Sequence, residues 1–190
     1  MKKIAIILFS ALLFFSLSTH DKPFPAETSL TVVIPCAIQS LYTYSAGVPC
    51  STPPICVCIS IKPGRAYSIL ELIRRVLKDS DNYSTSLINY QIDYDALKLL
   101  YRDLDQAVPD MHDISYTTNV LEYSRFLQIL YNGTWLNETN SETALKYLSE
   151  SSFKEGLTRL LPQNLVVPRK FGEYGINEIK QWHESGIVYA

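Results

Sequence analysis

The chain has 190 residues, with 17 basic and 19 acidic side chains and a formal net charge of −2. No long run of either charge occurs, so the basic surface that nucleic-acid binding requires is missing and we expect no nucleic-acid partner. The three scattered histidines, and four cysteines clustered within residues 36–58, match no metal-ligand spacing, so no metal centre is expected.

The first 19 residues have the pattern of a secretory signal peptide. Lys2 and Lys3 precede an apolar run over residues 4–15, and small and polar residues follow over 16–19. A run of about 12 apolar residues is short for a membrane span but typical of a signal, so we predict export to the periplasm or the extracellular space. An uncleaved anchor is the alternative. In both cases the membrane is a partner only through this segment.

Residues 20–60 have an anomalous composition, rich in Cys and Pro. Residues 31–60 carry no charged side chain and show no sustained helical or strand periodicity. This stretch is either a buried strand pair with proline-containing turns or a misread or deleted part of an ordinary domain. Export would permit a disulfide, for example between Cys36 and Cys50, but the pairing cannot be read from sequence.

Helical signals begin at Ser68, which with Glu71 forms a capping box, and apolar residues then recur on one face as far as Leu77. This predicts a helix that ends near residues 80–82. Further helices are predicted over residues 94–104, from 118 or 119 to 132, over 142–148 and over 153–160.

The last thirty residues are β-type. Residues 165–167 and 186–190 are predicted to be two antiparallel strands joined by a longer connection. The chain stops inside the second of them, so we expect a single domain over residues 61–190 that is incomplete at its C-terminal end.

Two triplets carry the functional signal: Ser80-Asp81-Asn82 at a helix end, and Lys170-Phe171-Gly172 on a strand 90 residues later. In this order, with Leu161-Pro162 before the strand, they resemble motifs of the serine β-lactamases and D-alanyl-D-alanine peptidases. The resemblance covers residues 63–190. It implies an α+β fold, with a helical subdomain beside an antiparallel sheet and a site in the crevice between them, where Ser80 and Lys170 approach from opposite sides.

The resemblance also implies acyl transfer to a serine oxygen, with no cofactor. Ser80 would relay a proton, and Asn82 would hydrogen-bond the substrate's amide side chain or the base lysine. Asp81 would brace the turn through backbone hydrogen bonds. Lys170 would attract the substrate's carboxylate.

On the same strand, Gly172 would let the substrate lie close along the backbone, as an added strand does, and the backbone N–H of Glu173 would be an oxyanion donor. Phe171 departs from the family's Thr or Ser, whose hydroxyl contacts the carboxylate. This departure predicts weaker recognition of ordinary β-lactams.

The nucleophile motif Ser-x-x-Lys is the larger departure. Ser29 follows the right apolar approach and Ser40 has the right local sequence, but neither has lysine three positions later. Ser151 and Lys154 match literally but lie between the other two motifs, which indicates chance. Ser29 is therefore the candidate nucleophile. Without the lysine it keeps a high pKa and attacks poorly.

A base for hydrolysing the acyl-enzyme is also missing. No Glu between the triplets has Asn four residues on, and Asp110 and Asp113 in the corresponding loop are expected to be solvated. Three hypotheses follow. The first is a monomeric serine hydrolase acting on a β-lactam or a peptidoglycan stem peptide. The second is a catalytically dead remnant that binds such ligands or nothing. The third is an exported interaction domain in which the triplets are coincidental.

Overall fold

The computed structural model describes residues 29–30, 61, 65–89, 91–109, 118–176 and 179–189, and at residues 29–30 and 173–181 it describes the backbone alone. The predicted signal peptide, the cysteines and the anomaly of residues 31–60 lie outside the described residues. The same holds for Ser40, Asp110 and Asp113.

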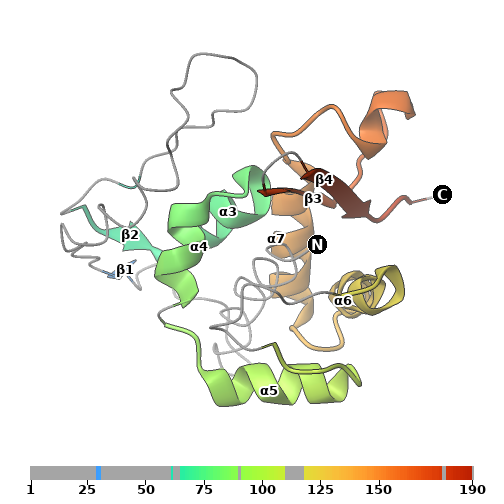
Figure 1. The fold of residues 1–190 in the computed structure, drawn as a ribbon. Coiled ribbons are helices and arrows are strands. Elements are labelled where there is room, and N and C mark those ends of the chain that lie inside the picture. Colours follow the sequence, from blue (N-terminus) through green and yellow to red (C-terminus); the bar gives the residue numbers. More distant parts are fainter. Residues whose placement is uncertain are drawn as a thin grey trace.

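Helices make up most of the described fold (Figure 1). They are α3 (Ile69–Asp79), α4 (Asn82–Asn89), α5 (Tyr94–Asp103), α6 (Val120–Asn132), α7 (Glu138–Ser149) and the short 3-10 helix η1 (Leu157–Leu160). No helix in these described ranges is long and apolar enough to cross a bilayer.

Side-chain caps start the helices where the sequence indicates. The Ser68 hydroxyl accepts the N–H of Glu71 at 3.1 Å, which starts α3. Asn119 and Glu122 form a reciprocal capping box at the start of α6, with N–H to oxygen distances of 2.9 and 3.2 Å. Each cap satisfies N–H groups that the first helical turn leaves unpaired, so the predicted starts of both helices are confirmed.

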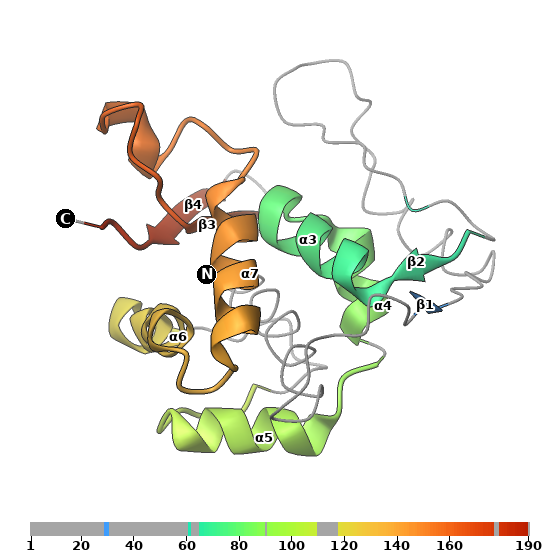
Figure 2. The same cartoon turned by 180° about the vertical axis from the view of Figure 1, so that it is seen from behind.

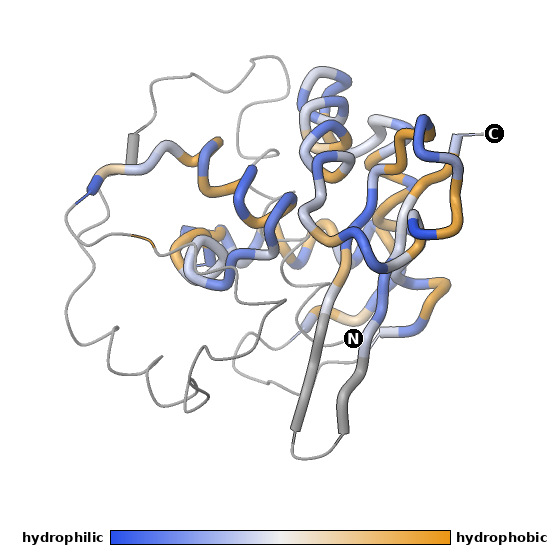
Figure 3. Tube along the Cα trace, turned by 90° about the horizontal axis from the view of Figure 1, so that it is seen from above, coloured by the Kyte–Doolittle hydropathy of each residue, from blue (hydrophilic) through white to orange (hydrophobic). Residues whose placement is uncertain are grey.

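The core forms where α3 packs against α4 and α7 and where α6 packs against α7, and the reverse view shows α3 beside α7 and inclined to it (Figure 2). Hydropathy alternates along the helices (Figure 3), as expected for helices with one buried face. The buried side chains of α3 are Leu72, Ile73, Val76 and Leu77. Burying each of these four contributes about 1.5–3 kcal/mol.

Two antiparallel strands, β3 (Arg169–Ile176) and β4 (Ile179–Gly186), form a hairpin beside the helices (Figure 1). Arg169 pairs with Gly186 and Ile176 with Ile179, in a continuous register. At the other end of α3, β1 (Ser29–Leu30) pairs with β2 (Tyr67–Ser68). The α+β class, with helices beside a small antiparallel sheet, is therefore confirmed.

Several predicted elements need correction. Helix α4 was not predicted, because its Ser, Thr and Asn residues give a weak helical pattern. Helix α7 begins at Glu138, earlier than predicted, because Asn137 accepts the N–H of Asn140 at 2.9 Å. Of the helix predicted over 153–160, only η1 forms.

The strand expected at Lys170-Phe171-Gly172 is confirmed as part of β3, but the positions of the two predicted apolar strands are wrong. Neither 165–167 nor 187–189 is a strand, and the hairpin lies between these apolar stretches. Neither strand contains a run of consecutive apolar side chains, so a search for such runs overlooks both.

Candidate functional site

Ser80 lies at the C-terminal end of α3 in the left-handed conformation, with φ 55° and ψ 35°. Its N–H donates to the carbonyl of Val76 at 3.1 Å, and the next N–H, that of Asp81, reaches back to Arg75 at 3.4 Å. Glycine is the usual residue for this kind of helix end, because a side chain there costs about 1–2 kcal/mol. A serine at this position is therefore a strained placement of the kind that clusters at functional sites.

Asp81 holds the turn from α3 into α4. Its buried carboxylate accepts the N–H of Tyr83 at 3.1 Å and the hydroxyl of Ser84 at 2.6 Å. Burial raises the pKa of Asp81, while these hydrogen bonds oppose the rise. The carboxylate thus caps α4 and fixes the direction in which the chain leaves Ser80.

Lys170 reaches Ser80 from β3. Its side chain is 1% exposed, and its Nζ is within hydrogen-bond contact of Ser80 Oγ although the two residues are 90 positions apart. The Nζ also donates to the carbonyl oxygen of Phe171 at 2.9 Å. Burial lowers the pKa of Lys170 to about 7, because an ammonium loses its hydration in the interior.

The hairpin ladder directs backbone groups toward the site. Ile187 donates its N–H to the carbonyl of Pro168 at 2.9 Å, which extends the register by one hydrogen-bonded pair. Hydrogen-bonded and non-bonded pairs alternate along an antiparallel ladder. Gly172 therefore points its N–H and C=O at its partner His183, while Phe171 and Glu173 point theirs away from β4, toward the free edge of the hairpin.

Two other predicted site residues lie apart from the Ser80–Lys170 contact. Asn82 is exposed at the start of α4, and its carbonyl accepts the hydroxyl of Ser86 at 3.0 Å. Ser29 pairs with Ser68, which caps the opposite end of α3, roughly 16 Å along the helix axis from Ser80. The structure brings Ser80, Lys170 and Phe171 together but does not bring Ser29 to them.

The opposite face of β3 carries a second cluster, which no sequence motif indicates. Arg169 and Glu184 are an almost fully buried ion pair, with Nε to Oε1 at 3.0 Å. The other Glu184 oxygen accepts the N–H of Leu157 at 2.5 Å, and a Cβ on Gly156 would overlap it at 1.7 Å. This contact joins the hairpin to the start of η1.

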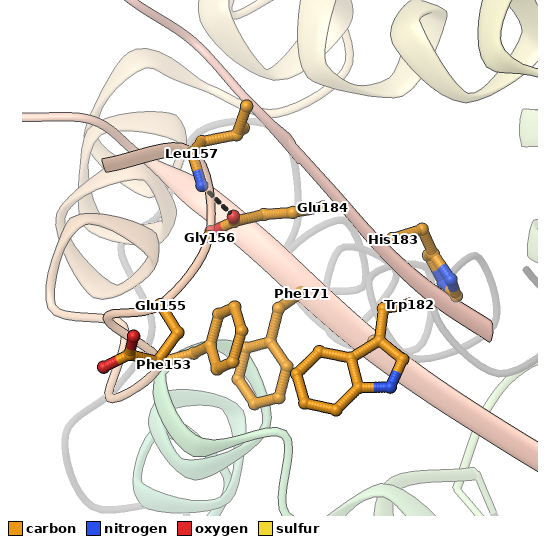
Figure 4. Close-up of a pocket in the computed structure, with 9 residues that line it drawn as sticks. Phe153, Glu155, Gly156, Leu157, Phe171, Trp182, His183 and Glu184 are labelled. Carbon is orange, nitrogen blue, oxygen red and sulfur yellow. Dashed lines mark hydrogen bonds between the residues drawn. The ribbon is translucent and has the colours of Figure 1, made fainter. Parts of the chain in front are cut away.

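Phe171 belongs to this second cluster. Its ring stacks on Phe153 with a centroid distance of 4.7 Å and an interplanar angle of 24°, and Trp182 lies 6.0 Å from Phe153 (Figure 4). A cavity of about 300 Å³ lies among these rings, Leu157 and Glu184. An aromatic surface therefore stands where the resemblance implies a hydroxyl. The alternation of side chains along the strand predicts that Phe171 and Lys170 leave β3 on opposite faces. The long Lys170 side chain nevertheless places its Nζ 4.9 Å from the centroid of the Phe171 ring.

His183 lies on the same face of the hairpin as Lys170, since its pairing partner is Gly172. Its Nε2 is buried without a hydrogen-bond partner. Burial, aided by the charge of Lys170, lowers the pKa of His183 to about 4. The imidazole is therefore neutral near pH 7 and adds no cation beside Lys170.

Among the residues that the structure describes, no group of three or more His, Cys, Asp or Glu side chains could hold a metal ion.

Comparison with known proteins places this geometry in a family. A family model described as "Beta-lactamase enzyme family" matches residues 50–190. No curated protein sequence matches the chain.

Solved β-lactamases have similar structures. One from Chitinophaga pinensis has a TM-score of 0.68 at 14% identity, and the match covers 99% of this chain and 70% of that one. The TLA-3 extended-spectrum β-lactamase gives 0.67 at 16% identity, covering 98% and 69%.

The penicillin-binding protein PBP-A, solved as a mutant in an acyl-enzyme complex with penicillin G, has a TM-score of 0.66 at 14% identity. That match covers 96% of this chain and 70% of PBP-A. At such low identities the structures establish the fold, and the family model, which spans more than half of the chain, establishes the membership. This chain belongs to the β-lactamase enzyme family, and its fold is that of the serine β-lactamases and penicillin-binding proteins.

Proposed function

We propose that this chain is an exported serine acyl-transfer protein that recognises β-lactams or the amides of peptidoglycan stem peptides. The observation that carries the proposal is the contact of Lys170 Nζ with Ser80 Oγ, which joins two motifs from opposite sides of the site. A hydroxyl that contacts an amine can pass a proton to the nitrogen that leaves when the amide bond breaks.

The backbone supports the same substrate class. An extended acyl group lying along the free edge of β3 would meet the outward N–H groups of Phe171 and Glu173, which are suited to a developing oxyanion. Gly172 leaves that edge without a side chain, and Asn82 is exposed and able to bind an amide. The penicillin G complex of the structurally similar PBP-A supports the choice of a penicillin as the first probe.

The test is covalent labelling of the full chain by penicillin G, followed by intact-protein mass spectrometry. A mass increase equal to one penicillin supports acyl transfer. Ser80→Ala should lower the labelling rate about 100-fold, the usual loss when proton transfer is removed. The matched control Ser124→Ala changes an exposed serine on α6 and should label at the unchanged rate.

A second candidate function is reversible binding without acylation. It is favoured by the position of Ser29, which the structure leaves at the far end of α3 from Lys170. Titration calorimetry with penicillin G distinguishes the two functions, since binding heat without a mass increase identifies a non-catalytic receptor. Neither heat nor an adduct would leave the exported interaction domain as the remaining hypothesis.

Export is part of the proposal and rests on the apolar segment at residues 4–15. Expressing the full chain in a Gram-negative host and separating periplasm from cytoplasm tests it. Recovery in the periplasmic fraction supports export, and retention in the cytoplasm refutes it.

A further inference from the structure

We propose that Ser80 is itself a nucleophile in this chain, with Lys170 as its general base. The inference rests on the proposed function, because it uses the same site and the same class of substrate. It assigns the acyl-enzyme bond to a residue for which the family resemblance implies only proton relay.

The first support is the surroundings of Lys170. Arg74, Arg75 and Arg169 each form an ion pair with a glutamate, whereas no carboxylate whose side chain the structure describes lies within ion-pair distance of Lys170. Its polar partners are the Ser80 hydroxyl and the Phe171 carbonyl, and its Nζ also lies 4.9 Å from the centroid of the Phe171 ring. A buried amine without a counter-ion favours its neutral form, which is the form that can accept a proton.

The neighbouring titratable groups do not stabilise the charged form of Lys170. Asp81, in the turn after Ser80, directs its carboxylate to Tyr83 and Ser84 of α4. His183 on β4 is neutral above a pKa of about 4. Arg169 and Glu184 lie on the other face of the hairpin and neutralise each other. Burial alone lowers the pKa of Lys170 to about 7, so near neutral pH about half of the molecules hold the free amine.

The hydrogen-bond geometry suits proton transfer. A neutral amine has two N–H groups and one lone pair. The Lys170 Nζ donates to the Phe171 carbonyl at 2.9 Å and also contacts Ser80 Oγ. In the neutral amine the first bond uses one N–H, and the lone pair can accept from the Ser80 hydroxyl at the second contact. Ser80 is partly exposed, so its oxygen can meet a substrate that Lys170, at 1% exposure, cannot reach.

The reaction balances with these two groups and water. Lys170 Nζ takes the proton of Ser80 Oγ as that oxygen bonds to the carbonyl carbon of the substrate. The carbon–nitrogen or ester carbon–oxygen bond breaks, and the Lys170 ammonium returns the proton to the leaving atom. Water then attacks the Ser80 ester while Lys170 takes a proton from the water and gives it to Ser80.

The experiment uses two probes on the full chain, penicillin G and the activated ester p-nitrophenyl acetate. Intact mass shows whether an adduct forms, and peptide mapping shows which residue carries it. Labelling should fall on Ser80, and its rate should rise with pH through a midpoint near the pKa of Lys170, about 7. Adduct mapping on the unaltered protein requires no variant to fold.

Variants then test whether Lys170 acts as a base or only as a positive charge. Lys170→Arg keeps the cation but cannot deprotonate near pH 7, so labelling should fall about 100-fold and lose its midpoint. Ser80→Ala should abolish labelling at this position. The exposed-site variants Ser124→Ala and Lys98→Arg are the matched controls and should retain the full rate.

The outcomes separate this inference from the proposed function. Ser80 adducts from both probes support both. A Ser80 adduct from the ester alone supports the Ser80–Lys170 pair and refutes β-lactams as substrates. A penicillin adduct on another residue, such as Ser29, overturns the pair and leaves the proposed function intact. The absence of both an adduct and hydrolysis with either probe overturns the pair and the proposed acyl transfer together, and calorimetry with penicillin G then shows whether reversible binding remains.

Discussion

Replacing Lys170 with methionine should change how the stability of the protein depends on pH. Methionine keeps the length and the apolar stem of the side chain and removes the amine, so no ammonium has to be buried. The free energy of unfolding should then respond less to pH than in the unaltered chain, because the largest burial-driven shift at a lysine is gone.

The sign and size of this pH dependence follow from the pKa of Lys170 in the folded and in the unfolded chain. Its pKa is about 7 in the folded chain and about 10.4 in an unfolded one. Between these values the unfolded chain binds more protons, so stability rises with pH, and it is lowest when pH falls below the folded pKa. From pH 6 to pH 9 the lysine should add about 2–3 kcal/mol to the free energy of unfolding.

Urea denaturation followed by circular dichroism at pH 6, 7, 8 and 9 measures this dependence. The difference between the unaltered chain and Lys170→Met isolates the lysine, since all other titrating groups are shared. Lys98→Met, at a half-exposed lysine on α5, is the matched control and should leave the curve unchanged. Parallel curves for Lys170→Met and the unaltered chain would show that Lys170 stays charged when buried, and would refute the base assignment with it.

Three further predictions follow from the same contacts. Phe171→Thr restores the family's hydroxyl and removes the stack on Phe153, so penicillin labelling should quicken while thermal denaturation shows a loss of about 1–2 kcal/mol. Gly156→Ala should cost about 3 kcal/mol in urea denaturation, because its Cβ would displace the buried carboxylate of Glu184 from its partners. Asn119→Ala removes the cap of α6 and should cost about 1 kcal/mol in the same assay without altering labelling.

The helices that sequence could predict are those with a cap and a strong apolar face. Helix α3 has both, in Ser68 and in its buried stripe ending at Leu77, and α6 has the Asn119 capping box. Helix α4 has a cap, the Asp81 carboxylate, but its short polar sequence carries little periodicity. Its stability comes from packing on α3, which only the folded chain reveals.

Some residues of the candidate site could likewise be predicted from the sequence, and others could not. Ser80 and Lys170 could be named from motifs, because a motif keeps residue types at fixed places in the chain. The Arg169–Glu184 pair and the aromatic stack of Phe171 could not, because they depend on a hairpin register that the apolar pattern misplaced. Ser29 was a candidate because of its local sequence, but a local sequence does not show near which end of α3 the residue will lie.

Arg169 and Lys170 are adjacent on β3 and therefore project to opposite faces of the hairpin. A slip of β3 by a single residue relative to the helices would exchange them and place a guanidinium against Ser80. Arginine does not give up its proton at any pH that proteins experience, so the exchanged site would hold a permanent cation and no base. The register of β3 thus decides whether a lysine or an arginine faces Ser80, and an insertion or deletion in the connection before β3, within residues 161–168, could exchange the two.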